Sequence, residues 1–128
     1  MTDSPPASTR RLQRWPSLHG IRSSDASVGA TPDGWSGLVC ATATPEERSS
    51  IGPWTGEGLG PFIAYSVPGS LDPSLVGVLA GLVEPLAQAG VPVMALSTYR
   101  TDWLLVEERH AAEAETSWVA AGIEVLDA

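Results

Sequence analysis

Six segments in the second half of the chain restrict the possible folds more than any other feature of the sequence. They favour, in order, a strand, a helix, two strands, a helix and a strand, at residues 61–67, 72–90, 91–96, 103–107, 109–121 and 123–126. The order β-α-β-β-α-β is typical of a ferredoxin-like unit, in which both helices cover one face of a four-stranded antiparallel sheet. We therefore expect an α+β fold.

The first expected helix has start and stop signals at both ends. Asp72 suits the N-cap and Pro73 the first helical position, while Gly90 is a natural C-terminal terminator. Pro85 lies inside the segment and removes one backbone hydrogen bond, so a kink or a late break is expected there. Apolar residues recur at helical spacing and should form the buried face, namely Leu75, Leu79, Leu82, Val83 and Leu86.

The first sixty residues carry weaker signals. Residues 1–10, rich in Ser, Pro and Thr, predict a disordered tail. A short strand is possible within 11–22, and the β-rich run 37–44 (GLVCATAT) is followed by a turn and another weak strand. We therefore expect a small β unit over 11–60 before a complete α+β domain over 61–128. One interpretation of the small unit is a degraded copy that has lost its helices.

The charge balance excludes some classes of partner. A net charge of -8 and a pI near 4.5 argue against nucleic acid and anionic membranes, because both require a basic surface. The longest apolar stretch, 75–96, is interrupted by glycine, glutamate and proline and predicts core instead of a membrane span. The first residues lack the apolar region of a secretory signal. A soluble cytoplasmic protein is expected.

The sequence offers little for catalysis. Cys40 is the single cysteine and lies in an apolar run, which favours an inert buried thiol. Cys40, His19 and His110 have no metal-ligand spacing. Nucleophile-elbow, phosphate-loop and dinucleotide-binding motifs are absent from the sequence. We expect no enzyme, no metal site and no cofactor.

A binding site is easier to derive, at the polar turn STYRTD (97–102). Asp102 could hold an ammonium group by charge-assisted hydrogen bonds, and the start of the preceding helix could hold a carboxylate. Gly77 would let a ligand approach the backbone closely. Together these groups suit a free amino acid. The alternatives are that Asp102 only closes the turn, that Gly77 only permits helix packing, and that Tyr99 is a half-buried core ring.

Two segments carry a family resemblance. LSTYRTDWLLV, preceded by LVGVLAGLVEPLAQAGVPV, resembles the ACT domain of the CASTOR-type cytosolic arginine sensors and their short bacterial relatives, which carry two ACT-like units. GLVCATATPEE is similar to a strand and turn in the first unit of that family. The resemblance implies a ferredoxin-like ACT domain over 61–128, preceded by a degenerate ACT-like unit.

The resemblance also implies a function without catalysis: an amino acid held at a seam between two ACT units, in a sensor or regulatory subunit. One unit would contribute the helix glycine and the polar corner, and the facing unit would contribute backbone from the entering strand. In this chain a homodimer would supply both sides, from the ligand-binding residues Gly77, Thr98, Tyr99 and Asp102 and, across the seam, Pro92 and Val93. Pro92 could contribute only its carbonyl.

Three positions depart from the family pattern. Leu75 stands where the arginine sensors have an acid, and an apolar side chain facing a guanidinium is unfavourable, so an uncharged amino acid is expected. Arg100 replaces a polar or acidic residue and could recruit a second carboxylate or lie in solvent. Glu115 replaces an aliphatic residue, which implies local divergence or an exposed position. These departures leave two other functions open, a ligand-free partner-binding protein and an enzyme using Asp102, Tyr99 or His110.

Overall fold

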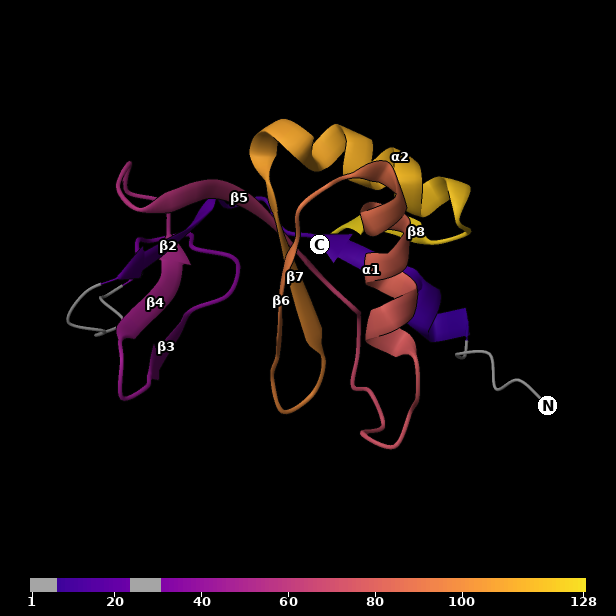
Figure 1. Ribbon diagram of the computed structural model, residues 1–128, viewed down its shortest axis with the longest axis horizontal. Coiled ribbons are helices and arrows are strands. Elements are labelled where there is room, and N and C mark those ends of the chain that lie inside the picture. Colours follow the sequence, from indigo (N-terminus) through magenta and orange to yellow (C-terminus); the bar gives the residue numbers. More distant parts are fainter. Residues whose placement is uncertain (1–6, 24–30) are drawn as a thin grey trace.

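The computed structural model describes residues 7–23 and 31–128, which form one eight-stranded sheet and two α-helices (Figure 1). The elements are η1 (Ala7–Arg10), β1 (Arg11–Arg14), β2 (His19–Ser23), β3 (Cys40–Ala43), β4 (Arg48–Pro53), β5 (Leu59–Ser66), α1 (Val78–Ala89), β6 (Met94–Ser97), β7 (Asp102–Glu107), η2 (Glu108–His110), α2 (Ala111–Ala120) and β8 (Glu124–Asp127). The β-α-β-β-α-β order expected after residue 60 is confirmed. Most of the tail expected over 1–10 lies outside the described residues, and Ala7–Arg10 form a 3-10 helix.

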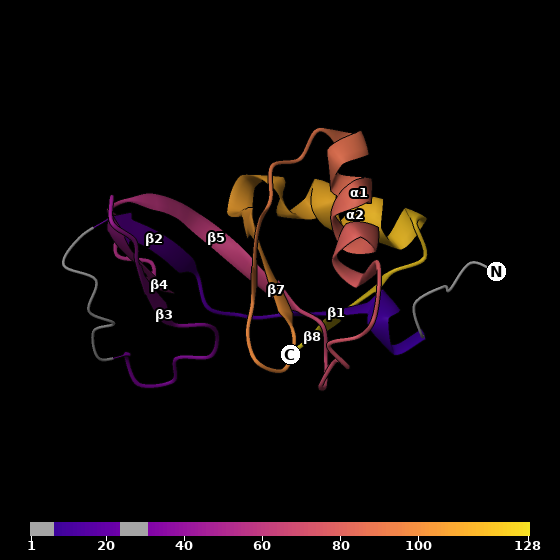
Figure 2. The ribbon, with the colours of Figure 1, turned by 60° about the horizontal axis from the view of Figure 1, so that its bottom comes forward.

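Strand β5 connects the two parts of the sheet. One edge of β5 pairs with β7, and the other pairs first with β2 and then with β1. Its first half therefore lies among the N-terminal strands, and its second half lies under the helices, as Figures 1 and 2 show. The strand is longer than the expected segment 61–67 because Leu59 and Gly60 already belong to it.

Strand β1 occupies a position that the sequence did not predict. It lies between β5 and β8, antiparallel to β5 and parallel to β8, with Leu12 opposite Val125. The expected four-stranded sheet thus has a fifth strand, supplied by the N-terminal segment. Leu12 is fully buried toward the helices, which explains why so short a strand is held there. The expected division into a degenerate ACT-like unit over 11–60 and a domain over 61–128 stays a prediction.

Strands β2, β4 and β3 form an antiparallel arm that extends away from both helices (Figure 1). The β-rich run 37–44 and the weak strand after it are β3 and β4. The segment 11–22 contains two strands, β1 and β2, instead of one.

Helix α1 begins later than the sequence predicts. Asp72 does not cap it: one carboxylate oxygen of Asp72 accepts hydrogen bonds from the Ser74 backbone N–H at 2.9 Å and the Ser74 hydroxyl at 2.8 Å. This local turn replaces the first helical turns, and α1 starts at Val78 after Gly77, whose φ of 81° is left-handed. The helix continues through Pro85 to Ala89, and Gly90 closes it with a left-handed φ as expected.

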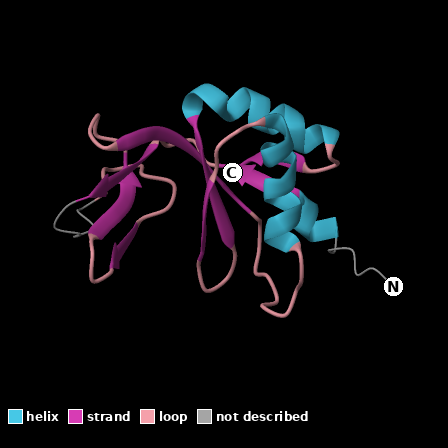
Figure 3. Ribbon diagram, in the orientation of Figure 1, coloured by secondary structure: helices cyan, strands magenta, loops and turns pink. Residues whose placement is uncertain are grey.

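The two helices cover one face of the sheet and enclose the main core (Figure 3). Leu82 and Leu86 of α1 are buried as predicted, and Leu75, Leu79 and Val83 pack partly buried against the same cluster. Trp118 of α2 is fully buried and its indole N–H donates to the Leu82 carbonyl at 2.7 Å, which ties the helices together.

The opposite face of the sheet carries a smaller apolar cluster. Phe62, Ala64 and Leu105 are buried there, with partly buried residues packed against them, including Trp15 and Trp103. Within residues 7–23 and 31–128, the two α-helices are too short to cross a membrane.

Candidate ligand-binding site

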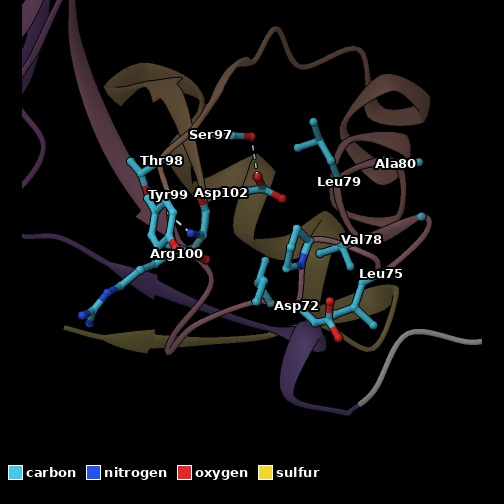
Figure 4. Close-up of a pocket in the computed structure, with 14 residues that line it drawn as sticks. Asp72, Leu75, Val78, Leu79, Ala80, Ser97, Thr98, Tyr99, Arg100 and Asp102 are labelled. Carbon is cyan, nitrogen blue, oxygen red and sulfur yellow. Dashed lines mark hydrogen bonds between the residues drawn. The ribbon is translucent and has the colours of Figure 1, made fainter.

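A cavity of about 430 Å³ opens between the β5–α1 connection, the start of α1 and the β6–β7 turn (Figure 4). The connection contributes residues 71–73, 75 and 77, the helix contributes 78–80, and the turn contributes 97–102. The segments come together because the Leu71 backbone N–H donates to the Arg100 carbonyl at 2.7 Å. A site at the polar corner of the sequence thus has a physical enclosure.

Four of the six residues predicted to bind the ligand line this cavity. They are Gly77, Thr98, Tyr99 and Asp102. Pro92 and Val93 do not line it: Pro92 is exposed, and Val93 packs partly buried against the core beneath the helices. Because these two residues were expected to act from a facing unit, a single chain leaves their role a prediction.

Asp102 is the best-oriented carboxylate of the cavity. One of its oxygens accepts a hydrogen bond from the Ser97 hydroxyl at 2.6 Å, and Figure 4 shows the side chain pointing toward α1. In the described chain the other oxygen accepts no hydrogen bond. Ser97 therefore fixes the side chain while leaving an acceptor free for a ligand donor.

The two threonines of the corner serve the turn. The Thr98 backbone N–H donates to the Thr101 carbonyl at 2.8 Å, and the Thr98 hydroxyl accepts from the Thr101 N–H at 3.3 Å. The Thr101 hydroxyl donates to the Val67 carbonyl at 2.8 Å and fastens the turn to the end of β5. These bonds explain the unusual polarity of the corner: its hydroxyls build a rigid loop that presents Asp102.

Tyr99 and Arg100 occupy the tip of the turn. Tyr99 is fully exposed, so the reading of this ring as half-buried core is wrong. In Figure 4 the Arg100 side chain extends away from Asp102 and from α1. At the tip, the exposed Tyr99 ring therefore lies at the rim of the cavity, whereas the Arg100 guanidinium points away from the cavity.

The start of α1 faces the cavity with unused donors. The Gly81 N–H donates to the Gly77 carbonyl at 2.9 Å, so the backbone N–H groups of residues 78–80 precede the first intrahelical bond. These groups carry the positive end of the helix dipole, and the first turn of α1 contains no acidic residue. Leu71, Leu75 and Leu79 add apolar walls. The cavity thus combines an anion-binding backbone, a carboxylate and aliphatic surface.

The titratable groups near this cavity differ in their surroundings. Asp72 lines it, and hydrogen bonds from the Ser74 backbone and hydroxyl lower the pKa of its carboxyl, which makes it a weaker base. His110 lies in η2 and is not a lining residue. Among the described residues no group of three His, Cys, Asp or Glu side chains is placed to hold a metal ion.

His19 has a structural environment in the arm. It is fully buried, its Nδ1–H donates to the Ser17 carbonyl at 2.9 Å, and its Nε2 accepts the Leu38 N–H at 2.9 Å. Burial lowers the pKa of its imidazole. Cys40 is half-buried, and burial raises the pKa of its thiol, which lowers its reactivity.

Sequence reasoning missed one polar network beside the main core. Glu115 is not exposed, as one reading of its divergence proposed: its side chain is 24% accessible, pairs with Arg14 and accepts the Tyr65 hydroxyl at 2.7 Å. Arg14 also pairs with Asp127 at 2.6 Å. Burial is the main cause that raises the pKa of the Tyr65 phenol. An acid on the apolar stripe of a helix was the available signal that a buried partner existed.

Comparisons with known proteins place the fold. The solved structure of protein Atu0741 from Agrobacterium tumefaciens is similar, with a TM-score of 0.75, 22% identity and 92% of each chain covered. A protein of unknown function from Vibrio cholerae, VC0802, described as a possible transport protein, gives a TM-score of 0.66 at 15% identity, over 85% of this chain and 86% of that one.

At these identities the likeness shows a shared fold, and no curated protein matches the chain. Residues 61–116, from β5 into α2, match the family model of the ACT domain. This part of the chain is therefore similar to an ACT domain.

Proposed function

We propose that this protein is a non-catalytic, cytoplasmic ACT module that binds a free amino acid and acts as a sensor or regulatory subunit. One observation carries the proposal: the cavity places the free oxygen of Asp102 and the unused N–H groups of residues 78–80 along the same enclosure. Such a pair matches the ammonium and carboxylate groups that all free amino acids share.

The apolar walls favour a ligand with an uncharged side chain. Leu75 lines the cavity at the position where the resemblance to the CASTOR-type arginine sensors would require an acid. A guanidinium beside Leu71, Leu75 and Leu79 would lose its hydration without gaining a partner. Aliphatic or small neutral side chains would instead bury apolar surface against these leucines.

A second copy of the chain would complete the site. Among the described strands β6 pairs only with β7, so its other edge is available to a partner. Pro92 and Val93 lead into this edge strand, where they could contribute backbone to a facing cavity. Ligand held at such a seam would favour the paired state over the separate one, which is how a binding module becomes a sensor.

Isothermal titration against the common amino acids tests the proposal. We expect at least one uncharged amino acid to bind, and Asp102→Asn to weaken it by roughly 10- to 100-fold through loss of a charge-assisted hydrogen bond. Glu113→Gln is the matched control, since this exposed carboxylate lies on α2 outside the cavity. Absence of any amino-acid binding tighter than about 1 mM to the wild type would refute the proposal.

A ligand-free, partner-binding module is the second candidate. Val76 is 80% accessible and Tyr99 is fully exposed, and both lie at the cavity mouth or next to residues that line it. A contiguous patch formed by such side chains would suit a protein contact. Capture of one specific protein by the wild type, abolished by Tyr99→Ser and indifferent to added amino acids, would favour this function over sensing.

A further inference from the structure

A second cavity, of about 610 Å³, lies on the other side of the β6–β7 turn, over the face of the sheet that the helices leave uncovered. Residues 98–101 of the turn line both cavities, whereas Asp102 lines only the first. The lining also includes Gln13, Trp15, Ser66 and Trp103 from the strands and their ends, and Arg100 from the turn.

The sheet register brings this second set of side chains together. Gln13 of β1 lies opposite Ser66 of β5, and Ser66 lies opposite Trp103 of β7. Residues directly opposite one another in antiparallel strands project to the same face of the sheet. Trp15, just beyond β1, stacks on Trp103 with the ring centroids 5.3 Å apart and the planes inclined by 26°. The two stacked indoles therefore form an aromatic floor of the cavity.

The polar groups around this floor have hydrogen-bonding capacity left over. The Ser66 side chain belongs to a residue only 3% accessible and accepts the Trp15 indole N–H at 2.9 Å, but in the part of the chain that the structure describes its own hydroxyl hydrogen has no acceptor. A buried hydroxyl whose donor is unused favours an acceptor supplied from outside. The Gln13 amide likewise makes no hydrogen bond to the described residues.

Arg100 supplies positive charge at the rim. Its side chain is exposed and extends away from the first cavity (Figure 4), and within residues 7–23 and 31–128 it forms no ion pair. The chain as a whole has a net charge of -8, and Arg100 gives the rim of this cavity a positive charge that no described acid pairs with. Arginine binds carboxylates through two parallel N–H groups and also stacks on aromatic rings.

We propose that this second cavity binds a planar aromatic carboxylate. Its ring would stack on the Trp15–Trp103 surface, and its carboxylate would accept hydrogen bonds from Arg100 and the Ser66 hydroxyl. Stacking of aromatic rings and charge-assisted bonds to a guanidinium are separate contributions, so a ligand needs both features. The inference is independent of the amino-acid site, although the shared turn would let one ligand influence the other.

Naphthoate is a suitable probe, with naphthamide as its uncharged match and cyclohexanecarboxylate as its non-aromatic match. We expect naphthoate to bind the full chain with a Kd below about 1 mM and both analogues to bind at least about tenfold more weakly, by isothermal titration. In nitrogen-15 NMR spectra, naphthoate should shift the indole N–H signals of Trp15 and Trp103.

Matched variants separate this site from general adhesion and from the first cavity. Arg100→Gln should weaken naphthoate by at least about tenfold and leave naphthamide unchanged, while Arg48→Gln, at another exposed arginine, should change neither. Asp102→Asn should leave naphthoate binding intact because Asp102 does not line the second cavity.

Three results would overturn the proposal: no naphthoate binding, equal binding of naphthoate and naphthamide, or unchanged binding after Arg100→Gln. Indole signals that shift on concentrating the protein alone, together with self-association in sedimentation, would assign this face to a contact between copies instead.

Discussion

The two parts of the sheet differ in what covers them. Around β5, β7, β1 and β8, two helices enclose a core that includes Leu12, Tyr65, Leu104 and Trp118, all fully buried. Within residues 7–23 and 31–128, the arm of β2, β4 and β3 has no helix over it. Its most buried side chain is a histidine, His19, whose ring centroid lies 4.7 Å from that of Trp35.

The two parts of the sheet are stabilised in different ways. The helix-covered part is stabilised mainly by removal of apolar surface from water, which tolerates small changes in shape. The arm has only the smaller apolar cluster, against which Ile21 and Ile51 pack, and it adds directional contacts that include the two hydrogen bonds of the His19 ring. Its stability should therefore respond to single atoms and to protons, and the candidate site lies in the more robust part.

The largest expected effect is in the helix-covered core. Trp118→Ala would remove a fully buried indole and its hydrogen bond to the Leu82 carbonyl. We expect a loss of about 3–5 kcal/mol in the free energy of unfolding, measured by urea denaturation. Val119→Ala, at a neighbouring residue that is 62% exposed, should change it by less than about 0.5 kcal/mol. Similar losses for the two variants would contradict the placement of this core.

A smaller effect is expected in the arm. A Cβ atom at Gly37 would lie 2.4 Å from atoms of the His19 ring, so Gly37→Ala must displace the histidine. We expect a cost of about 1–3 kcal/mol, seen by hydrogen exchange as lost protection in β2–β4 while α1 and α2 keep theirs. Gly52→Ala is the control, because its Cβ would meet only Val39 at 3.7 Å. Equal loss of protection in the helices would show that the two parts unfold together.

The smallest effect is a pH dependence confined to the arm. Burial lowers the folded-state pKa of His19 below the unfolded value of about 6.5, so the unfolded state binds a proton first as the pH falls. Stability of the arm should be complete above about pH 6.5 and decrease below it, by at most about 1.4 kcal/mol per pH unit for one proton.

Exchange of the Leu38 amide reports this change directly, since it donates to His19 Nε2. After correction for intrinsic exchange rates, its protection should fall from about pH 6.5 to 5.5 in the wild type. His19→Gln should flatten the profile. A wild-type profile that is already flat would contradict a lowered pKa of His19 in the folded state.

Periodicity predicted the helix-covered part well, because the apolar spacing of 72–90 and 109–121 reports burial directly. Periodicity did not predict the structure correctly where local and distant interactions compete. Asp72 and Pro73 have the composition of a helix start, but the Asp72 carboxylate makes a closer turn with Ser74, and Gly77 sets the true boundary. The position of β1 could not be predicted, since four residues of a short strand carry no information about which strands they separate.

The residues of the two cavities likewise differ in whether the sequence could predict them. Asp102 and Gly77 were predicted from local chemistry and Thr98 from the family resemblance. All three line one cavity, because a turn and a helix start are local structures. The second cavity was not predicted, although Arg100 was singled out, because Trp15 and Trp103 are neighbours only through the pairing of β1 and β7 with β5. Site residues that depend on sheet register lie beyond what a single sequence indicates.

The ladder between β1 and β8 has a consequence for how the chain reaches its structure. The Arg14 side chain donates a hydrogen bond to Asp127, which lies 113 positions later in the sequence. The two residues are also partners in the ladder of β1 and β8. Contacts of such separation form slowly, because a long loop must close before they stabilise anything. During synthesis β1 can pair with β5 first, but the edge of β1 that β8 will fill stays open until β8 emerges. The molecule is therefore most exposed to mispairing with other chains just before its last strand arrives.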